Sequence, residues 1–353
     1  MTADELYMQR CIQLAKLGAG NVAPNPMVGA VLVYEDRIIG EGYHQKYGEA
    51  HAEVNCIASV HTADRRFIEK STLYVSLEPC AHFGKTPPCS DLIVRYKIPK
   101  VVIGSRDPFK EVDGRGIEKL KAAGTEVMTG ILQDACKNLN KRFFTFHNKQ
   151  RPYIILKWAQ TANKKIATTD NKRLIISNNI TNRAVHKWRF EEASILVGTH
   201  TAAMDDPLLT NRLWTGKNPV RLIIDKNLRL PSSLKIFNNE SPVIVFNYEK
   251  QPLQPNDTGS ITNKVYFFKI EKSKSLVRQI GDACYQLNIQ SILVEGGAKL
   301  LQSFIDEKLF DEIRIITNQD LIIDEGLAAP SFGGLLKPFD SFTIRNDKID
   351  FIL

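Results

Sequence analysis

One stretch of the chain reads Leu77-Glu-Pro-Cys-Ala-His-Phe-Gly-Lys-Thr-Pro-Pro-Cys89, and it follows an earlier segment, His51-Ala-Glu53. One His and two Cys are a tetrahedral zinc set whose fourth corner is left open for water. A Glu two residues after the His is placed to move protons for that water without binding the metal. We therefore predict His51, Cys80 and Cys89 as zinc ligands and Glu53 as the catalytic proton carrier.

These four residues, in this order and at this distance, are typical of zinc-dependent nucleobase deaminases. In such enzymes the metal makes hydroxide at neutral pH, and the non-ligand Glu moves protons while ammonia leaves. Two alternatives stay open. Two buried free Cys and a core His would give the same sequence, since Cys is often fully buried. A purely structural zinc site would need a fourth protein ligand, which His82 or His44 could supply.

The predicted ligands all fall at predicted helix starts. His51 opens a helix over 50–60, Cys80 follows a Pro, which is favoured in the first helical turn, and Cys89 opens a helix over 90–97. Helix N-termini present unpaired N–H groups and partial positive charge, which favours thiolate over thiol. This placement gives both cysteines a physical reason to bind metal.

Length and composition indicate a two-domain globular protein. The chain has 353 residues, enough for two full cores, with 43% apolar and 24% charged residues. We expect no secretory signal and no membrane-spanning segment, because neither a basic start leading into an apolar run nor a long apolar stretch is present. Six Cys are spread over the chain without a secreted disulfide pattern. A reducing, cytoplasmic location is therefore expected.

The net charge of +8 is ambiguous. It fits a nucleic-acid surface, a protein whose substrates and cofactor carry phosphates, or simply a basic soluble surface. No run of five or more consecutive Lys or Arg residues appears. Charge alone therefore selects none of these classes.

The first half predicts an alternating α/β domain. Its predicted elements are helix 3–19, strands 28–33 and 37–42 as a hairpin, helix 50–60, strands 71–77, 100–104 and 126–128, helices 90–97 and 114–123, and one long helix at about 131–145. Alternation of this kind implies a mainly parallel sheet with helices on both faces.

Arg151-Pro152 marks the seam between two predicted domains. After it the β/α alternation restarts, with strands 153–158, 194–198, 220–225, 243–246, 291–295 and 312–317 and helices 179–190, 272–287 and 298–306. The polar segment 252–263, which contains Pro and Gly, is predicted as a surface loop. We therefore expect domains at 1–147 and 150–353.

The zinc segment, with Pro24-Asn-Pro-Met-Val-Gly29 and Gly48-Glu-Ala-His-Ala-Glu53, resembles the bifunctional riboflavin-biosynthesis deaminase/reductase family. Other deaminases of nucleosides and nucleic acids usually separate the two Cys by two residues, whereas eight separate them here. The resemblance covers nearly the whole chain and continues in Asp107-Pro108, Gly114-Arg-Gly-Ile117, Arg151-Pro-Tyr153, Asp205-Asp-Pro-Leu-Leu-Thr210 with Arg212, and Glu295-Gly-Gly297. It implies an α/β protein in which a cytidine-deaminase-like three-layer α/β/α domain precedes a dihydrofolate-reductase-like α/β domain.

The resemblance implies two consecutive reactions. The first domain would use Zn²⁺ to hydrolyse the 2-amino group of 2,5-diamino-6-ribosylamino-4(3H)-pyrimidinone 5′-phosphate. The second domain would then reduce the ribosyl group to ribityl phosphate with NADPH. By matching positions, the resemblance implies substrate contacts in the first domain at Asn25, His44, His82, Lys85 and Asp107.

The second half offers one candidate dinucleotide site. No Gly-x-Gly-x-x-Gly follows a strand, so a Rossmann site is not indicated. A predicted strand instead runs into Gly296-Gly297 and a helix, where a phosphate can approach backbone N–H groups, although a simple tight turn would look the same. The resemblance favours the cofactor site and implies NADPH contacts at Ala159, Leu174, Thr201, Asp205, Gly297, Ala298, Lys299, Leu300, Leu301, Gln302 and Ser303.

The resemblance also implies contacts to the ribosyl phosphate in the second half, at Lys172, Arg189, Leu209, Arg212 and Glu295. The two guanidinium groups match phosphate geometry. Two departures from the family lie nearby. Asn163-Lys164 stands where Asp-Gly is common and Leu174 where Trp is frequent, and both are expected to affect the reductase loop or its hold on the cofactor.

The expected partner is a phosphorylated pyrimidine, with no nucleic acid and no membrane, and the family suggests a homo-oligomer (dimer or tetramer). Two rival functions remain. A nucleic-acid deaminase would suit the basic charge but not the Cys spacing or the lack of aromatic–basic interleaving. A regulatory protein that keeps zinc for structure and has lost reductase activity is the second rival.

Overall fold

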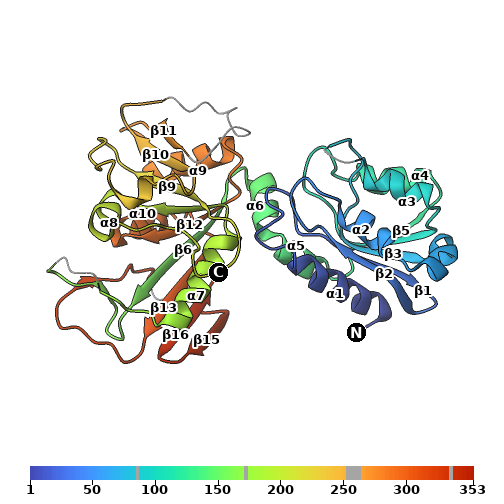
Figure 1. Ribbon diagram of the computed structural model, residues 1–353, viewed down its shortest axis with the longest axis horizontal. Coiled ribbons are helices and arrows are strands. Elements are labelled where there is room, and N and C mark those ends of the chain that lie inside the picture. Colours follow the sequence, from blue (N-terminus) through green and yellow to red (C-terminus); the bar gives the residue numbers. More distant parts are fainter. Residues whose placement is uncertain (85–86, 171–173, 252–263, 334–336) are drawn as a thin grey trace. The chain divides into compact units, whose positions relative to one another are not determined.

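The computed structural model of the protein describes residues 1–84, 87–170, 174–251, 264–333 and 337–353, so the predicted loop over 252–263 lies outside the described residues. The chain divides into two compact units, Met1–Lys149 and Gln150–Leu353, and each is built on one main sheet (Figure 1). Among the described residues we find no helix with the length and apolar character that a bilayer crossing needs.

The first unit is built on a five-stranded sheet in the order β2-β1-β3-β4-β5. Its strands are β1 (Gly29–Tyr34), β2 (Arg37–Tyr43), β3 (Thr72–Leu77), β4 (Lys100–Ser105) and β5 (Glu126–Thr129). Strand β1 pairs antiparallel with β2 and with β3, whereas β3, β4 and β5 run parallel. The predicted hairpin and the predicted parallel strands are both confirmed.

Helices cover both faces of this sheet, as predicted. They are α1 (Ala3–Lys16), α2 (Ala52–Ala58), η1 (Thr62–Lys70), α3 (Cys89–Arg95), α4 (Arg115–Ala122) and α5 (Gln133–Leu139), and α6 (Lys141–Lys149) ends the unit. Successive strand residues point to opposite faces. Ala30 and Leu32 therefore enter one core with α2, α3 and α4, while Val31 and Val33 enter a second core with α1 and α5 (Figure 1).

The prediction of one long helix over about 131–145 is wrong, because Asn140 separates α5 from α6. Asn140 is buried, and its side-chain amide binds the backbone of Met27 twice. The Met27 N–H donates to Asn140 Oδ1 at 2.8 Å, and Asn140 Nδ2 donates to the Met27 carbonyl at 2.8 Å. Hydrogen bonds to a distant part of the chain thus outweigh local helix propensity, which is a weak term.

The second unit is built on a nine-stranded sheet in the order β11-β10-β9-β8-β12-β6-β13-β16-β15. Its strands are β6 (Tyr153–Gln160), β8 (Ser194–Val197), β9 (Val220–Ile224), β10 (Val243–Asn247), β11 (Val265–Lys269), β12 (Ser291–Gly296), β13 (Glu312–Asn318), β15 (Asp340–Ile344) and β16 (Asp347–Ile352). The strands from β11 to β13 are parallel, and β16 and β15 add to them antiparallel. A separate two-stranded sheet joins β7 (Lys165–Ala167) and β14 (Leu327–Ala328).

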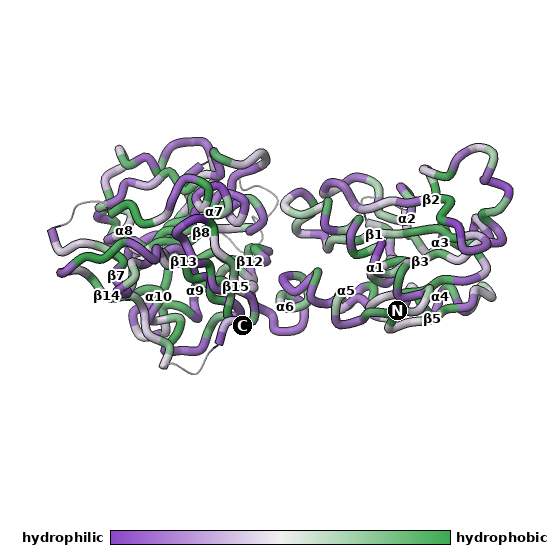
Figure 2. Tube along the Cα trace, turned by 90° about the horizontal axis from the view of Figure 1, so that it is seen from below, coloured by the Kyte–Doolittle hydropathy of each residue, from purple (hydrophilic) through white to green (hydrophobic). Residues whose placement is uncertain are grey.

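Helices also cover both faces of the second sheet. They are α7 (Asn179–Glu191), α8 (Thr199–Asp205), α9 (Leu276–Gln286) and α10 (Ala298–Asp306), with one turn of 3-10 helix, η2 (Lys235–Phe237). Ile154 and Leu156 pack with α9 and α10 on one face, and Ile155 packs with α7 on the other. Figure 2 shows the hydrophobic residues following the central strands of each unit.

Sequence reasoning missed several short elements: η1, α8, η2, β7, β11, β14, β15 and β16. Strand β15 illustrates the reason. Most of its residues are exposed, so no buried alternating pattern marks it, and it exists because β16 supplies a pairing partner. The larger parallel framework was predictable because buried parallel strands are nearly continuous apolar runs.

Candidate active site

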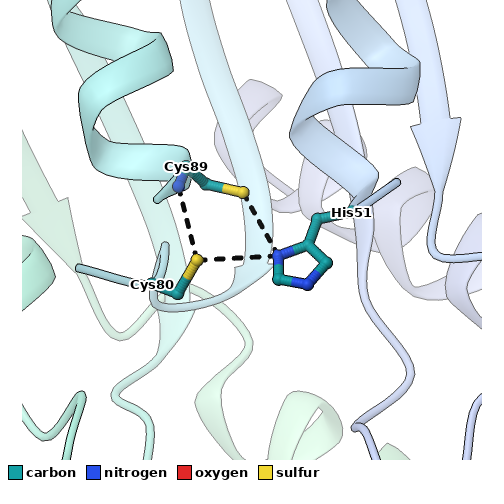
Figure 3. A group of neighbouring side chains, drawn as sticks. All are labelled: His51, Cys80 and Cys89. Carbon is teal, nitrogen blue, oxygen red and sulfur yellow. Dashed lines mark hydrogen bonds between the residues drawn. The ribbon is translucent and has the colours of Figure 1, made fainter. Parts of the chain in front are cut away.

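The three predicted zinc ligands lie together in the first unit, with their donor atoms facing one another (Figure 3). His51 Nδ1 lies 3.6 Å from Cys80 Sγ and 3.3 Å from Cys89 Sγ, and the backbone N–H of Cys89 donates to Cys80 Sγ at 3.3 Å. All three donor atoms lie within 4.8 Å of one another, and no other described His, Cys, Asp or Glu joins the group. Two sulfurs and one nitrogen at this spacing fit a zinc ion that keeps one open position.

Two of the three ligands occupy the predicted helix starts. His51 is the N-cap of α2, and Cys89 is the first residue of α3. The helix start predicted for Cys80 is wrong, because Cys80 lies in an irregular segment after β3. The preceding residue, Pro79, presents its carbonyl oxygen so close to Gly116 that a Cβ there would lie 2.0 Å away. Tertiary packing therefore fixes the backbone before Cys80. Local propensity alone had favoured a helical turn there.

Cys80 and Cys89 differ in acidity. Its pKa is lowered to about 4, because its sulfur accepts hydrogen bonds from Cys89 and from His51. The pKa of Cys89 is raised well above its usual range, because it donates to Cys80 and is buried. The hydrogen bond to Cys80 also raises the pKa of His51. Two cysteine sulfurs and an imidazole nitrogen that converge on one point have the donor chemistry that zinc selects.

Glu53 lies in the first turn of α2 and is buried, with 3% of its surface exposed. Burial raises its pKa, and the nearby negative charge of Cys80 raises it further. Its carboxyl group also forms a hydrogen bond with Cys89. Glu53 therefore accepts and holds a proton more readily than a surface Glu, and it does so within contact of the ligand set.

Asn25 and His44 lie beside the ligand set. Asn25 Nδ2 is 3.2 Å from His44 Nε2, and His44 Nδ1 is 3.0 Å from the carbonyl oxygen of Ala50. The His44 ring meets the His51 ring edge-on, with centroids 5.3 Å apart. Both ring nitrogens of His44 are engaged, which argues against His44 as a fourth ligand. Burial lowers the pKa of His44, so its imidazole is neutral at pH 7.

Asn140 is a site-supporting residue that sequence reasoning missed. Its two hydrogen bonds hold Met27, two residues beyond Asn25, and so fix the segment that carries Asn25. The Asn in the middle of a predicted helix was the available signal, because Asn disfavours helix interiors.

His82 and Asp107 are joined through Phe109. The His82 and Phe109 rings have centroids 5.9 Å apart, and the Phe109 N–H donates to Asp107 Oδ1 at 2.8 Å. Burial raises the pKa of Asp107 to about 7, and nearby acidic groups, including Cys80, add to the rise. The structure thus brings Asp107 and Cys80 near each other. Lys85, the remaining predicted contact in this unit, lies outside the described residues.

A buried charged cluster lies in the second unit. Arg189, on α7, donates from Nε and Nη2 to the two carboxylate oxygens of Glu295, on β12, at 2.8 Å each. Lys157, on β6, brings Nζ within 3.7 Å of the same carboxylate. Burial alone would raise the pKa of Glu295, yet Arg189 and Lys157 outweigh it and hold the pKa at about 2. Burial lowers the pKa of Lys157.

Replacing Arg189 with Ala is expected to destabilise the second unit by about 3–5 kcal/mol, because it leaves a buried carboxylate without its bidentate partner. Urea unfolding with a probe in that unit measures the loss, and Lys187→Ala, an exposed change on the same helix, is the control. The folded-state pKa of Glu295 is depressed from 4.5 to about 2. Its stabilising contribution is therefore present above about pH 4.5 and lost as the pH falls towards 2. Equal unfolding midpoints for Arg189→Ala and the control would contradict the prediction.

The Gly296-Gly297 junction lies between β12 and α10, as predicted, and Gly297 is the N-cap of α10. The Gly198 N–H donates to the Gly296 carbonyl at 3.0 Å. A Cβ on Gly297 would lie 3.0 Å from Thr201 Oγ1, so the structure brings these two predicted NADPH contacts together. The first N–H groups of a helix have no partners within it. Because glycine has no side chain, a cofactor phosphate could approach these N–H groups closely at Gly297.

The other predicted NADPH contacts lie on several elements of the second unit. Ala159 lies near the end of β6, which neighbours β12 in the sheet, and Asp205 ends α8. Leu300 and Leu301 point into the core and offer no side chain to a ligand. The remaining predicted positions on α10 are Ala298, Lys299, Gln302 and Ser303. Leu174 is half-buried in an irregular segment.

Two of the predicted phosphate contacts, Arg189 and Glu295, belong to the charged cluster. Arg189 Nη1 donates to the Thr210 carbonyl at 3.1 Å, which brings the segment from Leu209 to Arg212 to Arg189. Leu209 is buried, and Arg212 is exposed. Lys172 lies outside the described residues.

The Asn163-Lys164 departure is accommodated by local hydrogen bonds. Asn163 accepts from Thr161 Oγ1 at 2.7 Å and donates from Nδ2 to the Ile323 carbonyl at 2.7 Å. Lys164 adopts a left-handed conformation with φ of 60°, which glycine takes most readily. The loop thus keeps a glycine-type backbone with a lysine side chain on it.

Both units match described protein families. Residues 1–105 match the cytidine and deoxycytidylate deaminase zinc-binding region, and residues 152–319 match the RibD C-terminal domain. The riboflavin biosynthesis protein RibD of Aquifex aeolicus is 37% identical over 348 residues, which cover 98% of this chain and 95% of that protein. The RibD of Bacillus amyloliquefaciens is 36% identical, with 93% and 87% covered.

Solved structures agree with these matches. A diaminohydroxyphosphoribosylaminopyrimidine deaminase/5-amino-6-(5-phosphoribosylamino)uracil reductase from Thermotoga maritima is 35% identical, with a TM-score of 0.86 over 99% of this chain and 98% of that one. A RibD from Acinetobacter baumannii is 31% identical, with a TM-score of 0.87 and the same coverage.

Fold, zinc donor set and family matches together define a cytidine-deaminase-like zinc enzyme joined to a dihydrofolate-reductase-like reductase. The chain belongs to the RibD family of riboflavin biosynthesis proteins. It is a bifunctional enzyme, a deaminase and a reductase, with zinc and NADPH as its cofactors.

Proposed function

We propose that residues 1–147 deaminate 2,5-diamino-6-ribosylamino-4(3H)-pyrimidinone 5′-phosphate and that residues 150–353 then reduce its ribosyl group to ribityl phosphate. The observation that carries the first step is the convergence of His51, Cys80 and Cys89 beside a buried Glu53. The family resemblance carries the choice of substrate and the order of the steps.

In the first step, His51, Cys80 and Cys89 would hold a zinc ion, which would supply Lewis-acid activation of water at neutral pH. Glu53 takes a proton from the attacking water and delivers a proton to the leaving amino group. Burial and the resulting raised pKa suit Glu53 to carry that proton between the two events.

We assign substrate binding in the first unit to the residues around the ligand set. The Asn25 side-chain amide offers hydrogen bonds to the pyrimidine edge, and the neutral His44 imidazole orients that amide through the contact of Nε2 with Asn25 Nδ2 at 3.2 Å. Asp107, with a pKa of about 7, can donate or accept at neutral pH. His82 and Lys85 are assigned to the phosphate, because an imidazole N–H and a lysine ammonium group can donate hydrogen bonds to phosphate oxygens.

In the second step, NADPH supplies the hydride, and the chain supplies positioning. Gly297 and the first turn of α10 would hold a cofactor phosphate, and Thr201 lies against the glycine. Ala159, Leu174 and Asp205 complete the cofactor contacts. Glu295, fixed by Arg189, faces the ribosyl group with Leu209, Arg212 and Lys172.

A coupled assay on purified, metal-analysed protein tests both assignments. The diaminopyrimidinone ribosyl phosphate is supplied, and ammonia release and NADPH oxidation are followed separately. We expect both signals, with one zinc per chain. Ammonia without NADPH oxidation would show that the second half has lost its reaction. The Asn163-Lys164 departure would then be the first cause to test. Neither signal would favour the nucleic-acid deaminase or the structural-zinc protein.

Replacing Arg212 with Ala is expected to raise the reductase KM for the phosphorylated substrate about tenfold, because a charged hydrogen bond contributes roughly 1.5–3 kcal/mol. The deaminase rate should not change. Steady-state kinetics of both half-reactions measure the effect, and Arg183→Ala, another exposed arginine of the same unit, is the control. An unchanged KM with Arg212→Ala would remove this residue from the phosphate site.

We further propose that the protein is cytoplasmic, forms a dimer or tetramer of identical chains, and binds no nucleic acid. The eight-residue spacing between Cys80 and Cys89 and the lack of aromatic–basic interleaving support the last point. Sedimentation measures the oligomeric state. Tight, salt-sensitive binding of a labelled RNA would contradict the exclusion of nucleic acid.

A further inference from the structure

The zinc-binding stretch contains a second acidic residue, Glu78, which the deamination chemistry leaves without a role. It directly follows β3 and stands two residues before Cys80. Only 4% of its surface is exposed, so its carboxylate must be satisfied by the protein.

Four backbone N–H groups satisfy this carboxylate. Oε2 accepts from Asp107 at 3.2 Å and from Gly114 at 3.0 Å, and Oε1 accepts from Gly116 at 3.0 Å and from Ile117 at 3.2 Å. All four donors lie between β4 and the first turn of α4. Hydrogen bonds to a charged acceptor are roughly twice as strong as neutral ones.

Two backbone contacts reinforce the same connection. The Glu78 N–H donates to the Ser105 carbonyl at 2.9 Å. The Pro79 carbonyl lies against the Cα of Gly116, where a Cβ would be 2.0 Å from the oxygen. The backbone of Glu78 and Pro79 is therefore held at Ser105 and at Gly116, in the same region of the chain that the Glu78 side chain binds.

Gly116 and Ile117 lie in the first turn of α4, whose N-cap is Gly114. Gly114 has no side chain with which to cap the helix, and the N-terminus of a helix favours negative charge. Glu78 supplies that charge from another element. The cap thereby joins the start of α4 to the loop that carries a zinc ligand.

We propose that Glu78 is a positioning residue for the deaminase site, which sets the zinc ligand Cys80 and the substrate residue Asp107 through one carboxylate. This inference rests on the proposed zinc-dependent deamination. Asp107 is fixed because its own N–H binds Glu78, and Cys80 is fixed because only Pro79 separates it from the anchored residue. Groups that orient metal ligands typically change metal affinity roughly 10- to 100-fold when removed.

Glu78→Gln tests the proposal, because one of its carboxylate oxygens becomes an NH₂ group that cannot accept the paired N–H bonds. The control is Glu118→Gln, which removes an exposed acidic group from the first turn of the same α4. Zinc affinity is measured by competition with a chelator, and ligand geometry by the visible absorption of the Co²⁺-substituted protein. The deaminase KM and kcat are measured on zinc-loaded protein.

We expect Glu78→Gln to bind zinc roughly 10- to 100-fold more weakly, to shift the Co²⁺ absorption bands and to raise the deaminase KM. Glu118→Gln should match the wild type in each readout, and the reductase rate of both variants should stay unchanged. A Glu78→Gln protein with wild-type zinc affinity, Co²⁺ spectrum and KM would overturn the proposal. Failure of the wild type to bind zinc would instead overturn the proposed deaminase function.

A second variant covers the case in which Glu78→Gln does not fold. Gly116→Ala keeps the carboxylate but places a methyl group against the Pro79 carbonyl, and it should also weaken zinc binding and shift the Co²⁺ bands. Wild-type zinc affinity in Gly116→Ala would count against the proposal. Loss of the folded first unit in both variants, seen by circular dichroism, would also overturn it, because Glu78 would then maintain the fold and not the ligand geometry.

Discussion

Replacing Glu53 with Gln is expected to lower the deamination rate roughly 10²–10⁴-fold, the range that one positioned proton carrier contributes, while zinc remains bound. Gln has nearly the shape of Glu but cannot accept and return a proton. Glu53 is not among the three residues whose donor atoms converge, so the metal set is left intact. Ammonia release per bound zinc measures the effect.

The matched control is Glu49→Gln, which removes an exposed carboxylate four residues earlier in the chain. It should leave both deamination and zinc content at wild-type values. Since Glu53 is buried with a raised pKa, its neutral replacement should not unfold the unit. Substantial deamination by a zinc-loaded Glu53→Gln protein would exclude Glu53 as the proton carrier.

Replacing Cys80 with Ser is expected to remove both the metal and the deaminase activity. The pKa of Cys80 is lowered to about 4, chiefly because its sulfur accepts a hydrogen bond from Cys89. A serine hydroxyl group is far less acidic than a cysteine thiol, so it does not ionise to bind the metal. It is also a harder ligand than the sulfur and nitrogen donors of this kind of zinc site. Zinc content by metal analysis should fall below one-tenth of the wild-type value, while NADPH oxidation by the second unit continues.

The control for Cys80→Ser is Cys56→Ser, the same chemical change at a buried cysteine of α2 outside the donor set. Folded protein with this change should still contain one zinc per chain. A Cys80→Ser protein that is fully metallated and active would show that the ligand assignment is wrong. If Cys80→Ser loses zinc while Glu53→Gln keeps it, the ligand role of Cys80 is distinguished from the proton-carrier role of Glu53.

The chemistry of the first site could be predicted from the sequence because few residue types perform it. Two cysteine sulfurs and an imidazole bind zinc and a nearby carboxylate moves protons, and the order and spacing of these residues can be recognised in the sequence. The structure places the three predicted donor atoms within 4.8 Å of one another. The sheet was predictable for a similar reason, because the long apolar runs of buried strands leave few alternatives to burial.

The second unit could be predicted less fully. The sequence suggested Arg189 as a phosphate contact, since a guanidinium fork suits an anion. The structure shows that the same fork already holds Glu295 with two hydrogen bonds of 2.8 Å. Lys157, which no motif marked, lies beside the same carboxylate. Such pairings join residues far apart in the chain, and residue spacing does not encode them.

By itself, then, the sequence determined the family and the two α/β units and predicted the zinc donors, because these follow from residue chemistry and from local apolar periodicity. Only the tertiary structure decided how the parts are held. Asn140 ends a helix in order to bind Met27, and Glu78 caps α4 from the loop that carries Cys80. In both cases a polar side chain meets backbone groups remote in sequence. Burial makes such hydrogen bonds obligatory, but only the folded chain determines which groups are near enough to form them.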